Sequence, residues 1–323
     1  MHLYNPTAAN QRSVVFRRSR EQIIALALEG VECIKREAKH FGGEVVFEYS
    51  PESFSQTELD FARDISNAVI SAWEPTREHP MILNLPNTLE ACSPNVYADR
   101  IEWMSKHIQN RDSVIISVHP HNDRGCAVAS AELAVLAGAQ RVEGTILGNG
   151  ERAGNVDLIT LAFNYFSQGI DPRLRVEKVD AILEQVTSIT GMSVAERHPY
   201  VGSMIYTAFS GTHQDAIKKG MEHHKEHNSA TWEVPYLAID PRDIGREYKD
   251  SIRINSQSGK GGVAYVLKEI YGIDVPIEMQ SVIADEVKRV SEERGGEISP
   301  DEVRGIYEEI LKNHVQYQKK DRG

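Results

Sequence analysis

The sequence predicts an α/β fold in which parallel strands alternate with helices, because five segments that look like strands are each followed by helical periodicity. The units recur every ~30–40 residues, the length of a strand with its crossover helix. Polar residues stand at the carboxyl end of every expected strand. A doubly wound sheet usually concentrates its site at one switch point, so this ring of polar ends favours a (β/α)8 barrel. A closed barrel has eight strands, and this sequence shows five.

The five expected strands lie in the first half of the chain, at residues 2–5, 45–49, 81–85, 114–118 and 141–147. Ser19 with Gln22 forms a capping box that predicts the start of the first helix, and Gly42 predicts its end. Residues 61–72 form a second apolar stripe that Pro75 stops, and Ser93 followed by Pro94 opens a third helix. A fourth helix is expected over residues 127–136.

Beyond about residue 170 the strand pattern disappears. Residues 182–189, 216–224 and 301–314 read as helices, and the charge-rich stretches 222–227 and 292–302 read as solvated faces or loops. We therefore expect two parts: the carboxyl-terminal part of a barrel over residues 1–170, and mainly helical subdomains over residues 171–323.

The fourth strand carries the strongest chemical signal. An apolar run, Val114 to Val118, delivers His119 and His121 at its end. Residues two apart on an extended chain point to the same side, so both imidazoles can face one metal ion. Pro120 biases His119 toward an extended conformation and so stiffens the pair. The pair predicts a divalent metal site, of Zn²⁺, Mn²⁺ or Mg²⁺, and does not choose among them.

Two glycine-rich segments suggest anion contacts. The loop 148–155 follows a strand and precedes a helix, so the backbone amides of Gly148, Asn149, Gly150 and Glu151 are candidates for binding an anion such as a phosphate, although such loops are common. The segment 256–262 lacks the first glycine of a nucleotide-binding loop and has glycine after Lys260. It is expected to be a subdomain loop.

Composition excludes several classes. The chain has 323 residues and a net charge of −11, which argues against nucleic acid as a partner. No apolar run reaches the roughly 18 residues that span a bilayer, and the first residues carry no export or organelle signal. Three cysteines with no metal-type spacing fit a reducing compartment. A cytoplasmic location is expected, with a mitochondrial one as the alternative if the source is fungal.

Eight segments together carry a family resemblance: FEYSPESFSQTELDFA, LNLPNTLE, SVHPHNDRG, GNGERAGN, RHPYVG, TAFSGTHQDAIKKG, VPYLAIDPRDIGR and NSQSGKGGVAY. In this order they resemble 2-isopropylmalate synthase, in the longer form of fungi and actinobacteria-like bacteria. The resemblance implies a metal-dependent condensation of acetyl-CoA with 2-oxoisovalerate, giving 2-isopropylmalate and CoA in leucine biosynthesis. With that substrate, the anion expected at Gly148, Asn149, Gly150 and Glu151 is a CoA phosphate, and the segment 256–262 is a further candidate for CoA contact. The resemblance also implies a homodimer with shared active sites.

The resemblance assigns roles to single residues. Asn155 resembles a second-shell or water-bridged metal contact, and the positions of His2, Ser50 and Thr88 imply the keto-acid pocket. Glu52 is one candidate for the base that deprotonates acetyl-CoA. His213 and Tyr236 resemble a pair that reaches the neighbouring subunit's active site, so they are rival candidates for the same step.

Departures from the family leave alternatives open. The chain opens at what resembles barrel strand four, without the family's Arg-Asp pair on strand one, and stops before its regulatory domain. Cys126 stands where the family often has threonine. Homocitrate and citramalate synthases share the His-x-His core, and a non-catalytic, merely dimerising fragment is the rival from another class. A lyase of the same superfamily is expected to carry a cysteine in loop 148–155, where this chain has none. Expressed alone, these residues are expected to be poorly soluble or oligomeric and inactive.

Overall fold

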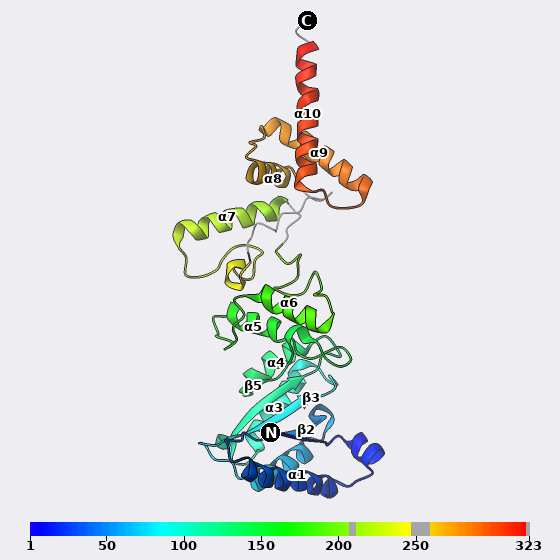
Figure 1. The fold of residues 1–323 in the computed structure, drawn as a ribbon, viewed down its shortest axis with the longest axis vertical. Coiled ribbons are helices and arrows are strands. Elements are labelled where there is room, and N and C mark those ends of the chain that lie inside the picture. The colour runs from blue at the N-terminus through cyan, green and yellow to red at the C-terminus, as the bar shows by residue number, and fades with distance from the viewer. Residues whose placement is uncertain (207–210, 247–258, 321–323) are drawn as a thin grey trace. The chain divides into compact units, whose positions relative to one another are not determined.

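The computed structural model describes residues 1–206, 211–246 and 259–320. The chain divides into two compact units, Met1–Pro172 and Arg173–Gly323, each of which is described by itself. Figure 1 shows strands in the first unit and helices through the second. The sequence therefore predicts the class correctly, an α/β sheet unit followed by a helical part.

The first unit contains one sheet of five parallel strands in sequence order. The strands are β1 (His2–Pro6), β2 (Glu48–Glu52), β3 (Met81–Asn87), β4 (Val114–Pro120) and β5 (Arg141–Val142). The helices are α1 (Arg20–Phe41), α2 (Leu59–Trp73), α3 (Pro94–His107), α4 (Ala127–Leu136) and α5 (Leu158–Ser167). Short helical turns occupy 11–16, 54–56, 111–113 and 146–148. A sheet of neighbouring parallel strands joined by helices matches the wall of a (β/α)8 barrel.

Local sequence signals set the helix ends. The Ser19 hydroxyl accepts from the amide of Gln22, whose side chain accepts from Ser19 in return, and α1 starts there. Gly42 ends α1 with a φ of 68°, a conformation that costs glycine little. Pro94 takes the first turn of α3, where its missing amide proton leaves no helical bond unmade.

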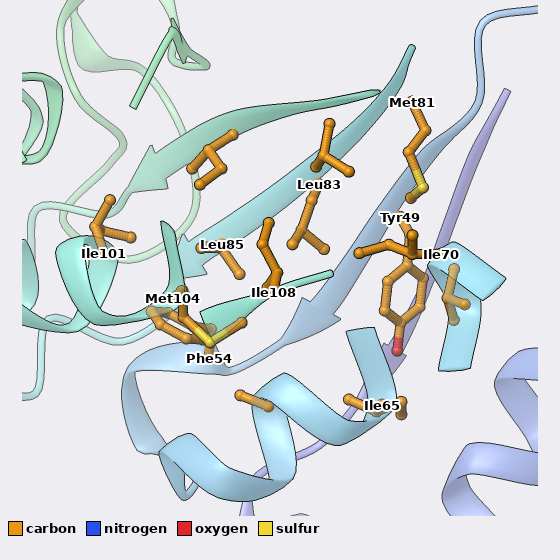
Figure 2. Packing of buried hydrophobic residues seen from close by; sticks show 14 of the residues in the cluster. Tyr49, Phe54, Ile65, Ile70, Met81, Leu83, Leu85, Ile101, Met104 and Ile108 are labelled. Atoms are coloured by element: carbon orange, nitrogen blue, oxygen red, sulfur yellow. The ribbon is translucent and has the colours of Figure 1, made fainter. Parts of the chain in front are cut away.

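One face of the sheet packs against the helices. Alternate strand residues such as Tyr49, Leu83 and Ile116 are fully buried there. Figure 2 shows Tyr49, Met81, Leu83 and Leu85 meeting helix residues that include Ile65, Ile70, Ile101 and Met104. Burial of a large apolar side chain contributes about 1.5–3 kcal/mol, so this face supplies most of the stability of the unit.

Two strand predictions are wrong at their ends. The second strand covers Glu48–Glu52 rather than 45–49. The fifth covers only Arg141–Val142 rather than 141–147, because Thr145 leaves the sheet and exchanges backbone hydrogen bonds with Val156 and Leu158. These partners lie beyond the glycine-rich loop, so no pattern within the strand itself signals the early stop.

The second unit is helical, with α6 (Val179–Thr190), α7 (Gly211–His227), a short turn (Pro241–Ile244), α8 (Lys260–Tyr271), α9 (Ile277–Arg294) and α10 (Pro300–Lys320). The sequence did not predict α8 and α9, which pack with α10 around Val266, Ile283 and Val303. The predicted loop 256–262 is partly outside the described residues, and Lys260 begins α8. Among the described residues, no helix has the length and apolar character that crossing a membrane requires.

Candidate active site

The face of the sheet turned away from the helices is polar. We call it the inner face, and it is made of His2, Glu48, Ser50, Glu52, Asn84, Ser117, His119, Arg141 and Glu143, which alternate with buried apolar residues. Two strands separate β2 from β5, a span of ~14 Å at ordinary strand spacing. Arg141 nevertheless lies 3.5 Å from the Glu48 carboxylate. The sheet therefore curves toward its inner face.

Hydrogen bonds link the strands across the inner face. The Ser50 hydroxyl lies 2.7 Å from Nε2 of His2 and accepts from the Asn84 side-chain amide at 3.0 Å. On the other side, Ser117 donates to Glu143 at 2.7 Å, and Arg141 also contacts Glu143. Since Ser50 and Asn84 are almost fully buried, these bonds replace the water that their polar groups lose.

Glu48 and Glu143 form a carboxyl pair at the centre of this network. Burial, followed by the neighbouring Glu143, raises the pKa of Glu48 to about 7. Burial also opposes ionisation of Glu143, but hydrogen bonds with His119 and Ser117 hold its pKa below the usual range. Near neutral pH, Glu143 is therefore ionised and Glu48 is partly protonated.

His119 and His121 end the fourth strand side by side. Their rings are nearly parallel, with centroids 5.2 Å apart and an angle of 10° between planes. The backbone amide of His121 donates to Asn87 on one side, and on the other the Pro120 carbonyl accepts from Val156 at 2.8 Å. Both sides of this segment are thus held, which fixes the backbone that carries the two imidazoles.

The glycine-rich loop brings Asn155 to the histidines. The Asn155 side-chain nitrogen lies 2.6 Å from Nε2 of His119. A Cβ on Gly150 would lie 1.8 Å from the Asn155 side-chain oxygen, and a Cβ on Gly154 would lie 2.1 Å from the Gly148 carbonyl. Glycine at position 154 is therefore required for this loop to close, and a side chain at position 150 would displace the Asn155 side chain.

Hydrogen bonds within the same loop reduce the number of backbone amides that can bind an anion. The amides of Gly148, Gly154 and Asn155 are bonded to carbonyls nearby. Of the four amides predicted to bind an anion, those of Asn149, Gly150 and Glu151 therefore remain. The loop also projects Arg152, which the sequence did not single out. Its guanidinium donates to Asp123 at 2.7 Å and to the Thr88 carbonyl at 2.6 Å, and it lies 3.1 Å from Nδ1 of His121.

The other predicted residues of this unit lie at both ends of the strands, not only at the carboxyl ends. Glu52 ends β2 on the inner face, and burial raises the pKa of its carboxyl. His2 starts β1 rather than ending it, and burial lowers its pKa. The Thr88 hydroxyl accepts from the backbone of Ser53, which gives it a structural role beside any contact with substrate. Ser50 is buried under His2 and Asn84, with 3% of its surface exposed.

The residues present fit part of a metal site. His119, His121 and Asn155 converge where the strand meets the loop, as the isolated bridge between His121 and Asn155 also indicates. In the described part of the chain, no three His, Cys, Asp or Glu side chains form a metal-binding cluster. The groups here that could ligate a metal ion are therefore two imidazoles and one amide, fewer than a full coordination shell.

In the second unit, the structure brings His213 and Tyr236 together. Their rings stack with centroids 4.1 Å apart. Gly220 on α7 allows this approach, since a Cβ there would lie 2.5 Å from Pro235. Tyr236 is 63% exposed, so the pair lies open on this unit's surface.

Sequence reasoning missed Glu48, Glu143, Arg141 and Arg152. Glu48 lies two residues before Ser50, and Arg141 lies two residues before Glu143. Residues two apart on a strand share a face, so this spacing could have placed the three charged side chains on the inner face. Arg152 carried no such signal, because only the folded loop turns it toward His121.

Comparison with known proteins assigns the chain to a family. The HMGL-like family profile matches residues 1–186, more than half of the chain, so the protein belongs to the HMGL-like family. A second profile, "Alpha-isopropylmalate synthase, post-catalytic domain-like", matches residues 203–268.

The curated relatives are more specific. A 2-isopropylmalate synthase of Helicobacter hepaticus is 52% identical over 97% of this chain and 56% of its own length. Those of Rhizobium meliloti and Clostridium acetobutylicum are 50% and 48% identical, each over 98% of this chain and over 56% and 58% of their own lengths. The resemblance noted from the motifs is therefore confirmed, and the chain spans a little over half the length of these relatives.

Among solved structures, an HMG-CoA lyase of Bacillus subtilis aligns with a TM-score of 0.47 and 16% identity, over 61% of this chain and 65% of that chain. A likeness of this size supports no transfer of function.

Proposed function

We propose that this chain is part of a 2-isopropylmalate synthase that condenses acetyl-CoA with 2-oxoisovalerate. The observation that carries the proposal is identity of about half of all positions, across both units, with curated proteins of that name. The convergence of His119, His121 and Asn155 at the strand end supports it, because that place suits binding of a 2-oxo acid beside a metal.

The inner face is proposed to bind and orient the keto acid. A divalent cation held by His119, His121 and Asn155 would supply Lewis acidity to the keto group. Thr88 follows the carboxyl end of β3, where it can contact the substrate. His2 starts β1 and reaches the substrate from the inner face, where Ser50 positions it through a 2.7 Å contact. The backbone amides of Asn149, Gly150 and Glu151, in the loop 148–155, are proposed to contact CoA.

Two groups compete for the proton of acetyl-CoA. Glu52 has a pKa raised by burial, and a base is most effective when its pKa lies near the working pH. His213 is the rival, and its stacking on exposed Tyr236 supports the proposal that the pair serves a neighbouring subunit in a homodimer.

The choice of keto acid separates this proposal from homocitrate and citramalate synthases. Release of CoA from acetyl-CoA should be followed with the intact enzyme, offering 2-oxoisovalerate, 2-oxoglutarate and pyruvate in turn. We expect the largest kcat/KM with 2-oxoisovalerate. A larger value with either other acid would reassign the substrate, and no release with any of them would support a non-catalytic role.

A matched pair of mixtures tests the shared site. His119→Ala and His213→Ala variants of the intact enzyme should each be inactive, and their hybrids should recover part of the activity if the two residues belong to different subunits. The control mixes His119→Ala with His121→Ala, which no hybrid can repair because both changes lie in one site. Hybrids that form without recovery would place His213 within its own chain's site, or outside catalysis.

A further inference from the structure

The two histidines face partners of opposite hydrogen-bonding chemistry. Arginine can only donate hydrogen bonds, and Arg152 lies 3.1 Å from Nδ1 of His121. Nδ1 of His121 must therefore accept, and a neutral imidazole that accepts at Nδ1 carries its proton on Nε2.

His119 is held the other way. A carboxylate only accepts hydrogen bonds, and that of Glu143 lies 3.7 Å from Nδ1 of His119. On the far side of the ring, the Asn155 side-chain nitrogen, a donor, lies 2.6 Å from Nε2. Both neighbours favour a proton on Nδ1 and a lone pair on Nε2. Metal ions bind the unprotonated nitrogen, so His119 would coordinate through Nε2 without a change of tautomer, once the neutral Asn155 amide gives way.

His121 cannot bind a metal while Arg152 stays in place. If Nδ1 is the coordinating atom, Arg152 already occupies its lone pair. If Nε2 coordinates, the proton moves to Nδ1 and two donors then face each other at 3.1 Å. Whichever nitrogen is used, the contact with Arg152 has to break.

We propose that Arg152 is a latch on His121: the Arg152–His121 contact and divalent metal binding by His121 exclude each other. This inference rests on the metal site proposed above. Arg152 also holds Asp123 at 2.7 Å and the Thr88 carbonyl at 2.6 Å, so a released guanidinium stays tethered. Metal binding thereby changes the contacts of the loop Gly148–Asn155, from which Asn149 to Glu151 would reach CoA.

Nuclear magnetic resonance of the metal-free protein tests the starting state. Nitrogen-15 shifts of the imidazoles should show the Nε2–H tautomer at His121 and the Nδ1–H tautomer at His119. Arg152→Met should remove the preference at His121 and leave His119 unchanged. The same tautomer at both rings of the unaltered protein would overturn the proposal.

Calorimetry with Zn²⁺ tests the exclusion. Arg152→Met should bind Zn²⁺ at least about tenfold more tightly than the unaltered protein, the fold-change expected for one charged hydrogen bond that no longer competes. Arg124→Met is the matched control, since it removes an equal charge from an exposed neighbour that does not contact either histidine; its affinity should change about threefold at most.

The effect of Arg152→Met should vanish when His121 is already alanine, which separates competition for His121 from general electrostatics. Persistence of the effect in that background, or affinity that is unchanged or weaker in Arg152→Met alone, would overturn the latch. Absence of Zn²⁺ binding in every variant, or tight binding that survives loss of both histidines, would overturn the metal site proposed above and the latch with it. An affinity that needs both histidines but does not respond to Arg152→Met would overturn the latch and leave the site standing.

Discussion

The two faces of the same sheet are built for different purposes. Leu83 and Ile116 point to the helices and are fully buried among apolar side chains. Their immediate neighbours Asn84 and Ser117 point the other way, into a hydrogen-bonded network of carboxylates, imidazoles and an arginine. One residue along a strand thus separates a side chain that stabilises the fold from one that is available for chemistry.

The inner face gives up stability to keep polar groups close together. Glu48 is kept partly protonated, and the Asn84 side-chain oxygen is buried without a partner among the described residues. An unsatisfied buried polar group costs about 1–3 kcal/mol. The helix-facing side offsets this, because each large buried apolar side chain contributes about as much.

The difference between the two faces is tested most directly by two alanine substitutions on β3, one on each face. Leu83→Ala should lower the free energy of unfolding by about 3 kcal/mol, from lost burial and a new cavity. Ile82→Ala, one residue away on the half-buried inner side, should cost less than half as much. Urea unfolding measures both, and equal losses would show that the inner face is packed as a core.

The inner face should dominate activity instead. In the intact enzyme, Glu52→Gln should lower kcat about 100-fold, the scale of losing acid–base assistance. Because burial raises the pKa of Glu52, the amide should leave stability at pH 7 unchanged or higher. Glu74→Gln, at an exposed helix end, is the control. An unchanged kcat in Glu52→Gln would leave His213 as the base.

Loop closure around Asn155 should depend on backbone shape. Gly154→Ala should destabilise the unit by about 2 kcal/mol, since its φ is 95° and the added Cβ would meet the Gly148 carbonyl. Gly125→Ala is matched in having a positive φ of 73° but open space around the added atom, so it should cost about 1 kcal/mol. A larger loss at Gly125 would contradict the close approach.

The carboxyl pair should make stability depend on pH. Burial and the nearby Glu143 raise the pKa of Glu48 from 4.5 to about 7, so the folded protein holds a proton that the unfolded chain releases. This contribution is complete below pH 4.5 and is lost as pH rises through about 7. Between pH 5 and pH 8 the unaltered protein should therefore lose about 1–2 kcal/mol more than Glu48→Gln, after a discount for partial exposure. Parallel pH profiles of the two proteins would contradict the raised pKa of Glu48.

The helical unit should show the weakest effect. Tyr236→Ala should change the unfolding free energy by about 0.5 kcal/mol or less, since the ring is 63% exposed. Val234→Ala, two residues away and 4% exposed, should cost about 1–2 kcal/mol. Thermal unfolding of both variants measures the difference. A Tyr236 loss as large as that of Val234 would mean that the His213–Tyr236 stack stabilises this unit.

Much of the site was readable from the chain itself. Spacing of two residues put His119 and His121 on one side, and glycine content marked the loop that carries Asn155. Local codes such as the Ser19 cap and Pro94 fixed helix ends, because they act between residues a few positions apart. The helices α8 and α9 were not predicted, because their apolar side chains pack against each other and against α10, which no local pattern shows.

The sequence by itself determined the alternation of strands and helices, the parallel sheet and the family, since all of these depend on local periodicity and on residues in a fixed order. Only the tertiary structure decided that Glu48 lies beside Glu143, 95 residues further along the chain, and that Arg152 turns onto His121. Such contacts depend on sheet curvature and loop closure. Both follow from the packing of the whole unit, so no local pattern encodes them.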